Sequence, residues 1–139
     1  MRLTKNFSLE EMVRSETAAR LGINNEPGTI PMENMKRLAE AILQPLRDAY
    51  GKPIIVSSGY RSPALNKAVG GVPNSQHQYG QAADIQAPRK CPKGEDGKTW
   101  DYKRENRRLF ELIQELRLPY QQLINENGYS WIQVSGPRK

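Results

Sequence analysis

The chain has 139 residues, of which 37% are hydrophobic and 26% are charged, and its net charge is +6. This length allows one domain with a buried core and leaves no room for two domains of ordinary size. No apolar run approaches the roughly 20 residues of a membrane-spanning helix, and the N-terminus lacks the apolar segment of a secretory signal. We therefore expect a single domain over residues 1–139, made in the cytoplasm without a signal peptide.

The chain contains one cysteine, Cys91, and one histidine, His77. These counts exclude an intramolecular disulfide, an all-cysteine zinc cluster and, in a monomer, a metal site with two or three histidines. The excess of positive charge favours an anionic partner: nucleic acid, a membrane surface or the acidic cell wall. The basic residues are concentrated in one stretch and at the C-terminus: Lys90, Lys93, Lys98, Lys103, Arg104, Arg107, Arg108, Arg138 and Lys139. We interpret the stretch as a solvated helix face and an exposed loop; a nucleic-acid-binding module is the rival interpretation, and it rests on charge alone.

Two helices are predicted in the first 51 residues. Ser8 followed by Glu11 is a capping-box signature, so the first helix is expected over residues 8–22. A second helix is expected over residues 31–51, with its opening proline at the N1 position and a kink at Pro45. The second helix has apolar residues at helical spacing, namely Met35, Leu38, Ala39, Ile42, Leu43 and Leu46.

The middle of the chain predicts two strands separated by a short helix. Residues 54–58 are β-branched and bounded by proline and glycine, which is typical of a buried strand. Ser62 then precedes a proline in the manner of an N-cap, and a helix is expected to end at residues 70–71. A polar loop over residues 72–80 leads into a second strand over residues 81–87.

The last third of the chain predicts an exposed loop, a helix and a hairpin. Residues 88–99 are rich in proline, glycine and charge, so we expect an exposed loop there. Two strands, over residues 121–125 and 130–135, flank an Asn-Gly dipeptide, which is a strong hairpin signal. Short strands joined by a tight turn indicate an antiparallel sheet, so the predicted class is α+β. The helix between the loop and the hairpin extends to about residue 117, with an apolar stripe of Leu109, Phe110, Leu112, Ile113 and Leu116.

Strand alternation places several polar side chains on one face of the predicted sheet. The alanine and isoleucine that flank Asp84 are expected to face the core, which puts Asp84 on the opposite face. The same alternation puts Trp131 and Gln133 opposite the core in the last strand. His77, in the loop before the Asp84 strand, can fold back over this face. One histidine, one carboxylate and a third polar group on a shared surface is how a mononuclear metal site is assembled.

A motif between residues 58 and 85 carries a family resemblance. The segment reads SGYRSPALNKAVGGVPNSQHQYGQAADI, and it meets the pattern SxHxxGxAxD at Ser75, His77, Gly80, Ala82 and Asp84. The chain thereby resembles the zinc D-Ala-D-Ala carboxypeptidase family, relatives of the zinc domain of hedgehog proteins. The resemblance extends upstream through NFSLEEMVRSETAARLGI and downstream to WIQVS, and so covers nearly the whole chain. It implies a small antiparallel sheet flanked by helices.

The resemblance implies one zinc ion held by His77 and Asp84. The family pattern WxHxS supplies a third histidine ligand, and this chain has Gln133 at that position. An amide oxygen suits harder ions such as Ca²⁺ better than Zn²⁺, so we expect Gln133 to be a poor third ligand and zinc to be bound weakly or at partial occupancy. Cys91 lies in the predicted loop, and we do not expect it to replace the missing histidine.

The resemblance also implies residues for substrate and catalysis. Arg61 is expected to bind and polarise the substrate near the scissile carbonyl; its alternative is a surface ion pair. Ser75 is expected to hydrogen-bond the substrate backbone, or else to cap its loop. Trp131 is expected to line the substrate side of the face. Glu126 is the expected general base, and its alternative is a solvated charge of the hairpin.

These residues imply a zinc metallopeptidase that acts on peptidoglycan stem peptides. The bond is of the D-Ala-D-Ala or the L-Ala-D-Glu type, and a monomeric phage or prophage protein acting on the cell wall is the expected context. A catalytically impaired relative, which binds wall peptides without efficient hydrolysis because of Gln133, is the alternative. No nucleic-acid partner is expected, because the basic stretch lacks interleaved exposed aromatic residues.

Overall fold

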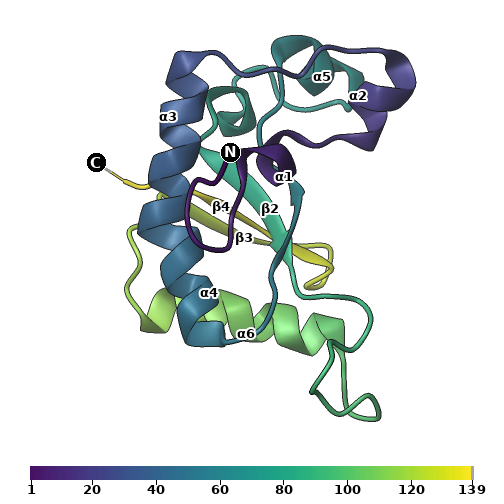
Figure 1. Ribbon diagram of the computed structural model, residues 1–139, viewed down its shortest axis with the longest axis vertical. Coiled ribbons are helices and arrows are strands. Elements are labelled where there is room, and N and C mark those ends of the chain that lie inside the picture. Colours follow the sequence, from purple (N-terminus) through teal and green to yellow (C-terminus); the bar gives the residue numbers. More distant parts are fainter. Residues whose placement is uncertain (139) are drawn as a thin grey trace.

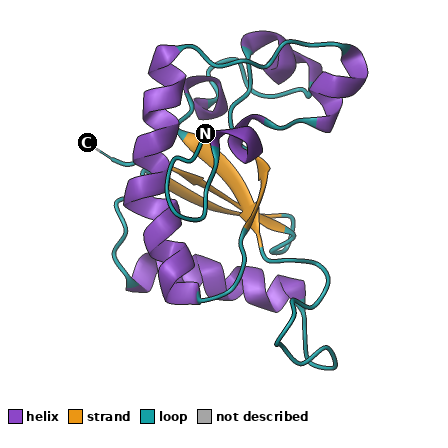
Figure 2. Cartoon of the chain, viewed as in Figure 1, coloured by secondary structure: helices purple, strands orange, loops and turns teal. Residues whose placement is uncertain are grey.

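A four-stranded antiparallel sheet and the helices packed against it make up the fold (Figures 1 and 2). The computed structural model describes residues 1–138, and its strand order is β1-β2-β4-β3. The predicted α+β class is confirmed. None of the helices in this described part is long and apolar enough to cross a membrane. The elements in chain order are α1 (Leu9–Val13), α2 (Glu16–Leu21), α3 (Thr29–Leu38), the π-helix η1 (Ala39–Leu43), α4 (Gln44–Tyr50), β1 (Ile55–Ser58), α5 (Pro63–Ala68), the 3₁₀ helix η2 (Gln76–Tyr79), β2 (Ala82–Gln86), α6 (Tyr102–Glu115), β3 (Gln122–Glu126) and β4 (Trp131–Ser135).

The N-terminal segment forms two short helices where one was expected. The capping box is present, since the Ser8 hydroxyl accepts from the Glu11 amide and the Glu11 carboxylate accepts from the Ser8 amide. The expectation of one continuous helix is wrong, because Arg14 adopts an extended conformation and ends α1. Ser15 then caps α2 by accepting a hydrogen bond from the amide of Ala18.

The segments α3, η1 and α4 follow one another without a break. The helix begins at a Gly28 cap, two residues earlier than expected, so Pro31 is its third residue and not its first. The kink expected at Pro45 takes the form of the π-helix Ala39–Leu43 just before it. Pro45 has no N–H to donate to the preceding turn, and a widened turn accommodates that loss. Gly51, in the left-handed conformation, caps the C-terminus of α4.

The hydrophobic core lies between the sheet and the helices. Ala83 and Ile85 of β2 and Ile132 and Val134 of β4 are fully buried, as strand alternation predicted. The helical partners in this core are chiefly Met35, Leu38, Ile42, Leu43, Leu46, Leu109, Leu112 and Ile113. The opposite face of the sheet is thereby left for polar side chains. Leu116 is 42% exposed and does not belong to the predicted stripe, since α6 has ended before it.

A buried polar cluster joins α4 to α6. The Tyr50 hydroxyl donates to Glu105 Oε1 at 2.6 Å, and Lys52 Nζ donates to the same oxygen at 3.0 Å. Burial opposes ionisation of Glu105, but these two hydrogen bonds outweigh it and hold the pKa of the carboxyl below its usual value. Burial and the same carboxylate raise the pKa of Tyr50. The loop before α6 is closed at its base, where Trp100 Nε1 donates to the Pro88 carbonyl at 2.8 Å.

The C-terminal hairpin has the predicted strands and a longer turn. Glu126 pairs with Trp131, so residues 127–130 form a four-residue loop around the Asn-Gly dipeptide. Asn127, Gly128 and Tyr129 all have positive φ. The hairpin register continues into β2, where Asp84 lies directly opposite Gln133.

Candidate metal and substrate site

The sheet brings three of the predicted site residues to neighbouring strand positions. Asp84 in β2 pairs with Gln133 in β4 on one side and with Ser58 in β1 on the other. Paired residues of antiparallel strands project to the same face, with Cβ atoms about 4.5–5.5 Å apart. Asp84 is 8% exposed, and Gln133 is half-buried. The strand pairing therefore sets an amide directly beside a buried carboxylate.

His77 is held over this face by the short helix η2. Ser75 caps η2, and its hydroxyl accepts a hydrogen bond from the His77 amide at 3.3 Å. Gly80 ends η2 with a φ of +72°, and a Cβ atom there would approach the Pro31 carbonyl oxygen to 2.3 Å. The close packing of η2 on α3 thus requires glycine at this position, and it leaves the His77 side chain 2% exposed.

One ring nitrogen of His77 is engaged, and the other is free. The Nδ1 atom lies 2.7 Å from the Gly59 carbonyl oxygen. A carbonyl oxygen can only accept, so Nδ1 carries a proton, and the lone pair of the neutral imidazole is then on Nε2. The close packing of α1 on this segment requires glycine at position 59, because a Cβ atom there would meet the Met12 carbonyl oxygen at 2.3 Å. A backbone carbonyl that orients a histidine and fixes its tautomer is typical of metal-binding histidines.

Two buried atoms of the site have no hydrogen-bond partner within residues 1–138. They are His77 Nε2 and Asp84 Oδ1, and they lie 3.4 Å apart. Leaving such a buried atom unsatisfied costs about 1–3 kcal/mol. Two ligand atoms placed about 2.0–2.2 Å from a tetrahedral metal ion are about 3.3–3.6 Å apart. The separation of these atoms therefore fits a single ion bound by both.

Gln133 is the third predicted ligand; it is paired with Asp84 across the strands, and it lines the same pocket as His77. Among residues 1–138, no group of three His, Cys, Asp or Glu side chains is placed to hold a metal ion. The predicted ligands on this face are one imidazole, one carboxylate and one amide, which is one nitrogen fewer than in a catalytic site built from two histidines and a carboxylate.

Arg61 stands beside the carboxylate. Its Nη2 atom lies 3.5 Å from Asp84 Oδ2, its Nε donates to Ser58 Oγ at 3.2 Å, and its Nη1 donates to Asn66 Oδ1 at 3.4 Å. Asp84 thus directs one oxygen toward Arg61 and the other toward His77. Arg61 is half-buried. The ion pair that was the alternative prediction for this residue is therefore present, but it does not lie on the open surface.

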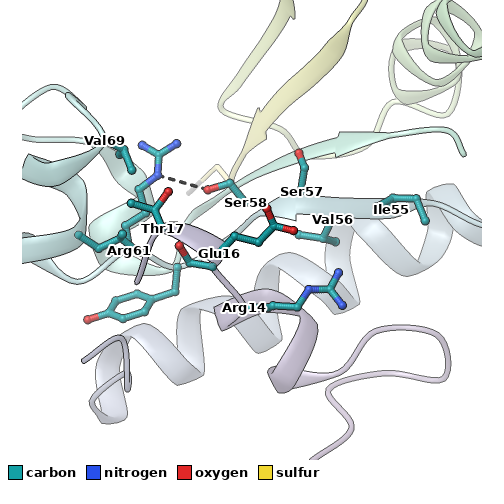
Figure 3. A pocket seen from close by; sticks show the side chains of 12 residues that line it. Arg14, Glu16, Thr17, Ile55, Val56, Ser57, Ser58, Arg61 and Val69 are labelled. Atoms are coloured by element: carbon teal, nitrogen blue, oxygen red, sulfur yellow. Dashed lines mark hydrogen bonds between the residues drawn. The ribbon is translucent and has the colours of Figure 1, made fainter. Parts of the chain in front are cut away.

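Two pockets meet at Arg61. The first has a volume of about 640 Å³, and its walls include His77, Ser75 and Gln133. Most of its other wall residues are uncharged, chiefly the side-chain amides of Gln76, Gln121 and Gln122 and the loop of residues 70–74. The second, of about 480 Å³, extends from Arg61 along β1 (Figure 3). Arg61 is the one residue that lines both pockets.

The other predicted site residues are Ser75, which lies in the same pocket as His77, and Glu126 and Trp131, which lie outside it. Ser75 uses its hydroxyl to cap η2, which is the alternative role considered for it. Glu126 and Trp131 face each other at the hairpin end of β3 and β4, two residues along the strand from Gln133. That spacing is about 7 Å. Glu126 makes no ion pair within residues 1–138, and neither residue lines the pocket that contains His77.

Three supporting groups were missed by the sequence reasoning. Ser58 and Asn66 hold the guanidinium of Arg61, and the Gly59 carbonyl sets the tautomer of His77. All three lie inside the segment that carries the motif, so their proximity in sequence was visible. Their contacts depend on how β1 and α5 turn around Arg61, which no residue pattern specifies.

The paired donor atoms, the neighbouring guanidinium and the pocket in front of them form a candidate mononuclear metal site on an α+β domain. The sequence profile of the Peptidase M15 family matches residues 5–99, which is more than half of the chain. The chain belongs to the M15 peptidase family, and the resemblance inferred from the motif is confirmed. The matched range contains Arg61, His77 and Asp84 and ends before the hairpin that carries Gln133.

One curated relative is similar to part of this chain. The zinc D-Ala-D-Ala carboxypeptidase of Streptomyces albus G is 54% identical to this chain over 46 residues. The aligned segment covers 32% of the chain and 18% of the length of that relative. The similarity is therefore high and local.

Proposed function

We propose that this chain is a zinc-dependent peptidase domain that acts on peptidoglycan stem peptides. The observation that carries the proposal is the pair of unpartnered buried atoms, His77 Nε2 and Asp84 Oδ1, set 3.4 Å apart next to Arg61. Family membership and the name of the Streptomyces relative, a zinc D-Ala-D-Ala carboxypeptidase, support the reaction class and the choice of zinc.

His77 and Asp84 would hold the zinc ion, with Gln133 beside them as a weak third ligand. A bound zinc ion supplies Lewis acidity and lowers the pKa of a coordinated water toward about 7. Residues of the chain orient the two zinc ligands. The Nδ1–H bond to the Gly59 carbonyl orients the His77 ring so that Nε2 is directed toward Asp84. The Arg61 guanidinium restrains the second oxygen of Asp84 at 3.5 Å.

Arg61 would also bind the substrate. Its guanidinium lines the pocket, and it can donate to a peptide carboxylate or to the oxyanion that develops at the scissile carbonyl. Glu126 is proposed as the general base that accepts a proton from the attacking water and passes it to the leaving amine. Ser75 and Trp131 would contact the peptide from the two ends of the open face. The scissile bond would be of the D-Ala-D-Ala or the L-Ala-D-Glu type.

A non-catalytic role in binding wall peptides is the second candidate, and Gln133 is the observation that favours it. The strand pairing places this amide beside Asp84, where the family pattern supplies an imidazole. Without a third strong ligand, zinc binds less tightly and is less able to polarise a carbonyl. Arg61 and the pocket would still bind a peptide carboxylate in that case.

Hydrolysis of a synthetic pentapeptide ending in D-Ala-D-Ala, measured with and without zinc by mass spectrometry, tests the proposal. We expect zinc-dependent cleavage by the wild-type chain that is lost in His77→Ala and Asp84→Asn. A second peptide with an L-Ala-D-Glu bond identifies the bond that is cut. Binding of both peptides without cleavage at any zinc concentration would favour the non-catalytic role, and cleavage retained in His77→Ala would refute the proposed site.

A further inference from the structure

The second pocket at Arg61 is a groove along β1, and the proposed chemistry leaves it without a role. We name it the β1 groove: it is bounded by the α1–α2 junction, by β1 and by α5. Figure 3 shows the side chains of Arg14 and Glu16 extending from that junction toward β1, while the Arg61 guanidinium lies beyond Ser58. Arg61 lines both pockets, so the groove is adjacent to the pocket that contains His77.

The floor of the β1 groove is an open strand edge. β1 is the first strand in the sheet order and pairs only with β2. Within residues 1–138, no other backbone group is hydrogen-bonded to residues 55–58. Ile55 and Ser57 are exposed there. An exposed edge of this kind accepts an extended peptide as an added strand, and four residues of β1 offer room for about three residues of peptide.

The outer wall of the groove carries two opposite charges. Arg14 and Glu16 are both exposed, and neither forms an ion pair or a side-chain hydrogen bond within the described residues. Both lie at the junction where α1 ends and Ser15 caps α2, so the break in the predicted helix is what brings them to the groove. A guanidinium binds a carboxylate, and a carboxylate binds an ammonium group.

We propose that the β1 groove binds the part of the peptide next to the scissile bond as an extended strand, and that Arg14 and Glu16 recognise a side chain ending in both a carboxylate and an ammonium group. A diaminodicarboxylic acid residue has this chemistry. The choice of a stem peptide as the ligand rests on the proposed function. The inference adds that the groove selects the diaminodicarboxylic acid residue of that peptide.

Two stem pentapeptides that begin with L-Ala-D-Glu, end in D-Ala-D-Ala and differ by one group provide the test. One contains meso-diaminopimelate and the other contains lysine, which lacks only the terminal carboxylate of that side chain. Binding to the full chain is measured by calorimetry without added metal, so that neither peptide is cut. We expect the diaminopimelate peptide to bind about threefold to tenfold more tightly, the range between an exposed ion pair and a hydrogen bond to a charged group.

Three variants assign the effect to the groove. Arg14→Gln is expected to abolish the preference by weakening only the diaminopimelate peptide, and Glu16→Gln is expected to weaken both peptides. Arg20→Gln, an exposed arginine of α2 outside the groove, is the matched control and should keep the preference. Equal affinity of the wild type for both peptides, or a preference retained in Arg14→Gln, overturns the inference.

The experiments distinguish a failure of the proposed groove from a failure of the proposed metal site. Zinc-dependent cleavage of either peptide, together with equal binding of both, would leave the proposed function in place and refute the groove. Failure of the wild-type chain to bind either peptide would refute the groove, and the proposed function would then be decided by the zinc-dependent cleavage assay alone.

Discussion

Replacing Gln133 by histidine is expected to convert a weak metal site into a strong one. Gln133 lies opposite Asp84 in the β2–β4 ladder, on the face over which His77 Nε2 is aimed. An imidazole at this position adds a third strong donor. Four-ligand zinc sites bind with about 10–16 kcal/mol, or about 3 kcal/mol for each ligand, so Gln133→His should lower the zinc Kd on the order of 100-fold.

The assay for this change is a competitive zinc titration followed by thermal unfolding. At a zinc concentration about 100 times the Kd, binding adds about 2.7 kcal/mol to the free energy of unfolding, which raises Tm by roughly 8–12 °C for a chain of this size. The rate of hydrolysis of a stem peptide by Gln133→His should also exceed that of the wild type. Gln122→His is the matched control, because it adds an imidazole to the same pocket from β3, opposite Ser135 rather than Asp84.

Tight, stoichiometric zinc in the wild-type chain with no gain in Gln133→His would show that another group is the third ligand. An equal gain in Gln122→His would show that the position opposite Asp84 has no special role.

Arg61→Ala should weaken binding of a D-Ala-D-Ala-ended peptide about tenfold or more in calorimetry; a fall in Tm without a loss of binding would make Arg61 a structural ion pair. Glu126→Gln should nearly abolish turnover while leaving metal content unchanged, since a general base is not a ligand, and unchanged turnover would move that role to another residue. Glu105→Gln should lower the free energy of unfolding by about 1–3 kcal/mol at pH 7, because Tyr50 and Lys52 lose a charged acceptor. The folded state lowers the pKa of Glu105 below its usual value of 4.5. The difference in the free energy of unfolding between wild type and variant is therefore complete above pH 4.5, and it is lost as the pH falls through the folded pKa. Urea unfolding at several pH values measures this difference.

Local patterns predicted the elements that position the site. Alternation around Asp84 and Gln133 placed both side chains on the face away from the core, and the structure pairs them directly. Ser8 and Glu11 predicted a helix start, and the capping box is present. These inferences succeed because strand alternation and helix capping depend on residues that are close in sequence.

Features that depend on contacts between distant segments were not predicted. The Tyr50–Glu105 hydrogen bond joins residues 55 positions apart, and the Gly59 carbonyl that orients His77 lies 18 positions away. The break between α1 and α2 was missed although Ser15 is a good cap, because a continuous helix through Arg14 satisfies the same composition. Only the packing of the helix ends against β1 and its neighbours distinguishes these two conformations.

A crystal of the wild-type chain grown with zinc tests the metal site most directly. An anomalous difference map at the zinc edge should show a peak about 2.0–2.2 Å from both His77 Nε2 and Asp84 Oδ1, and the peak should vanish in His77→Ala. A map with no peak between these two atoms, or with its peak at Cys91 instead, would contradict the assignment of His77 and Asp84 as the metal ligands.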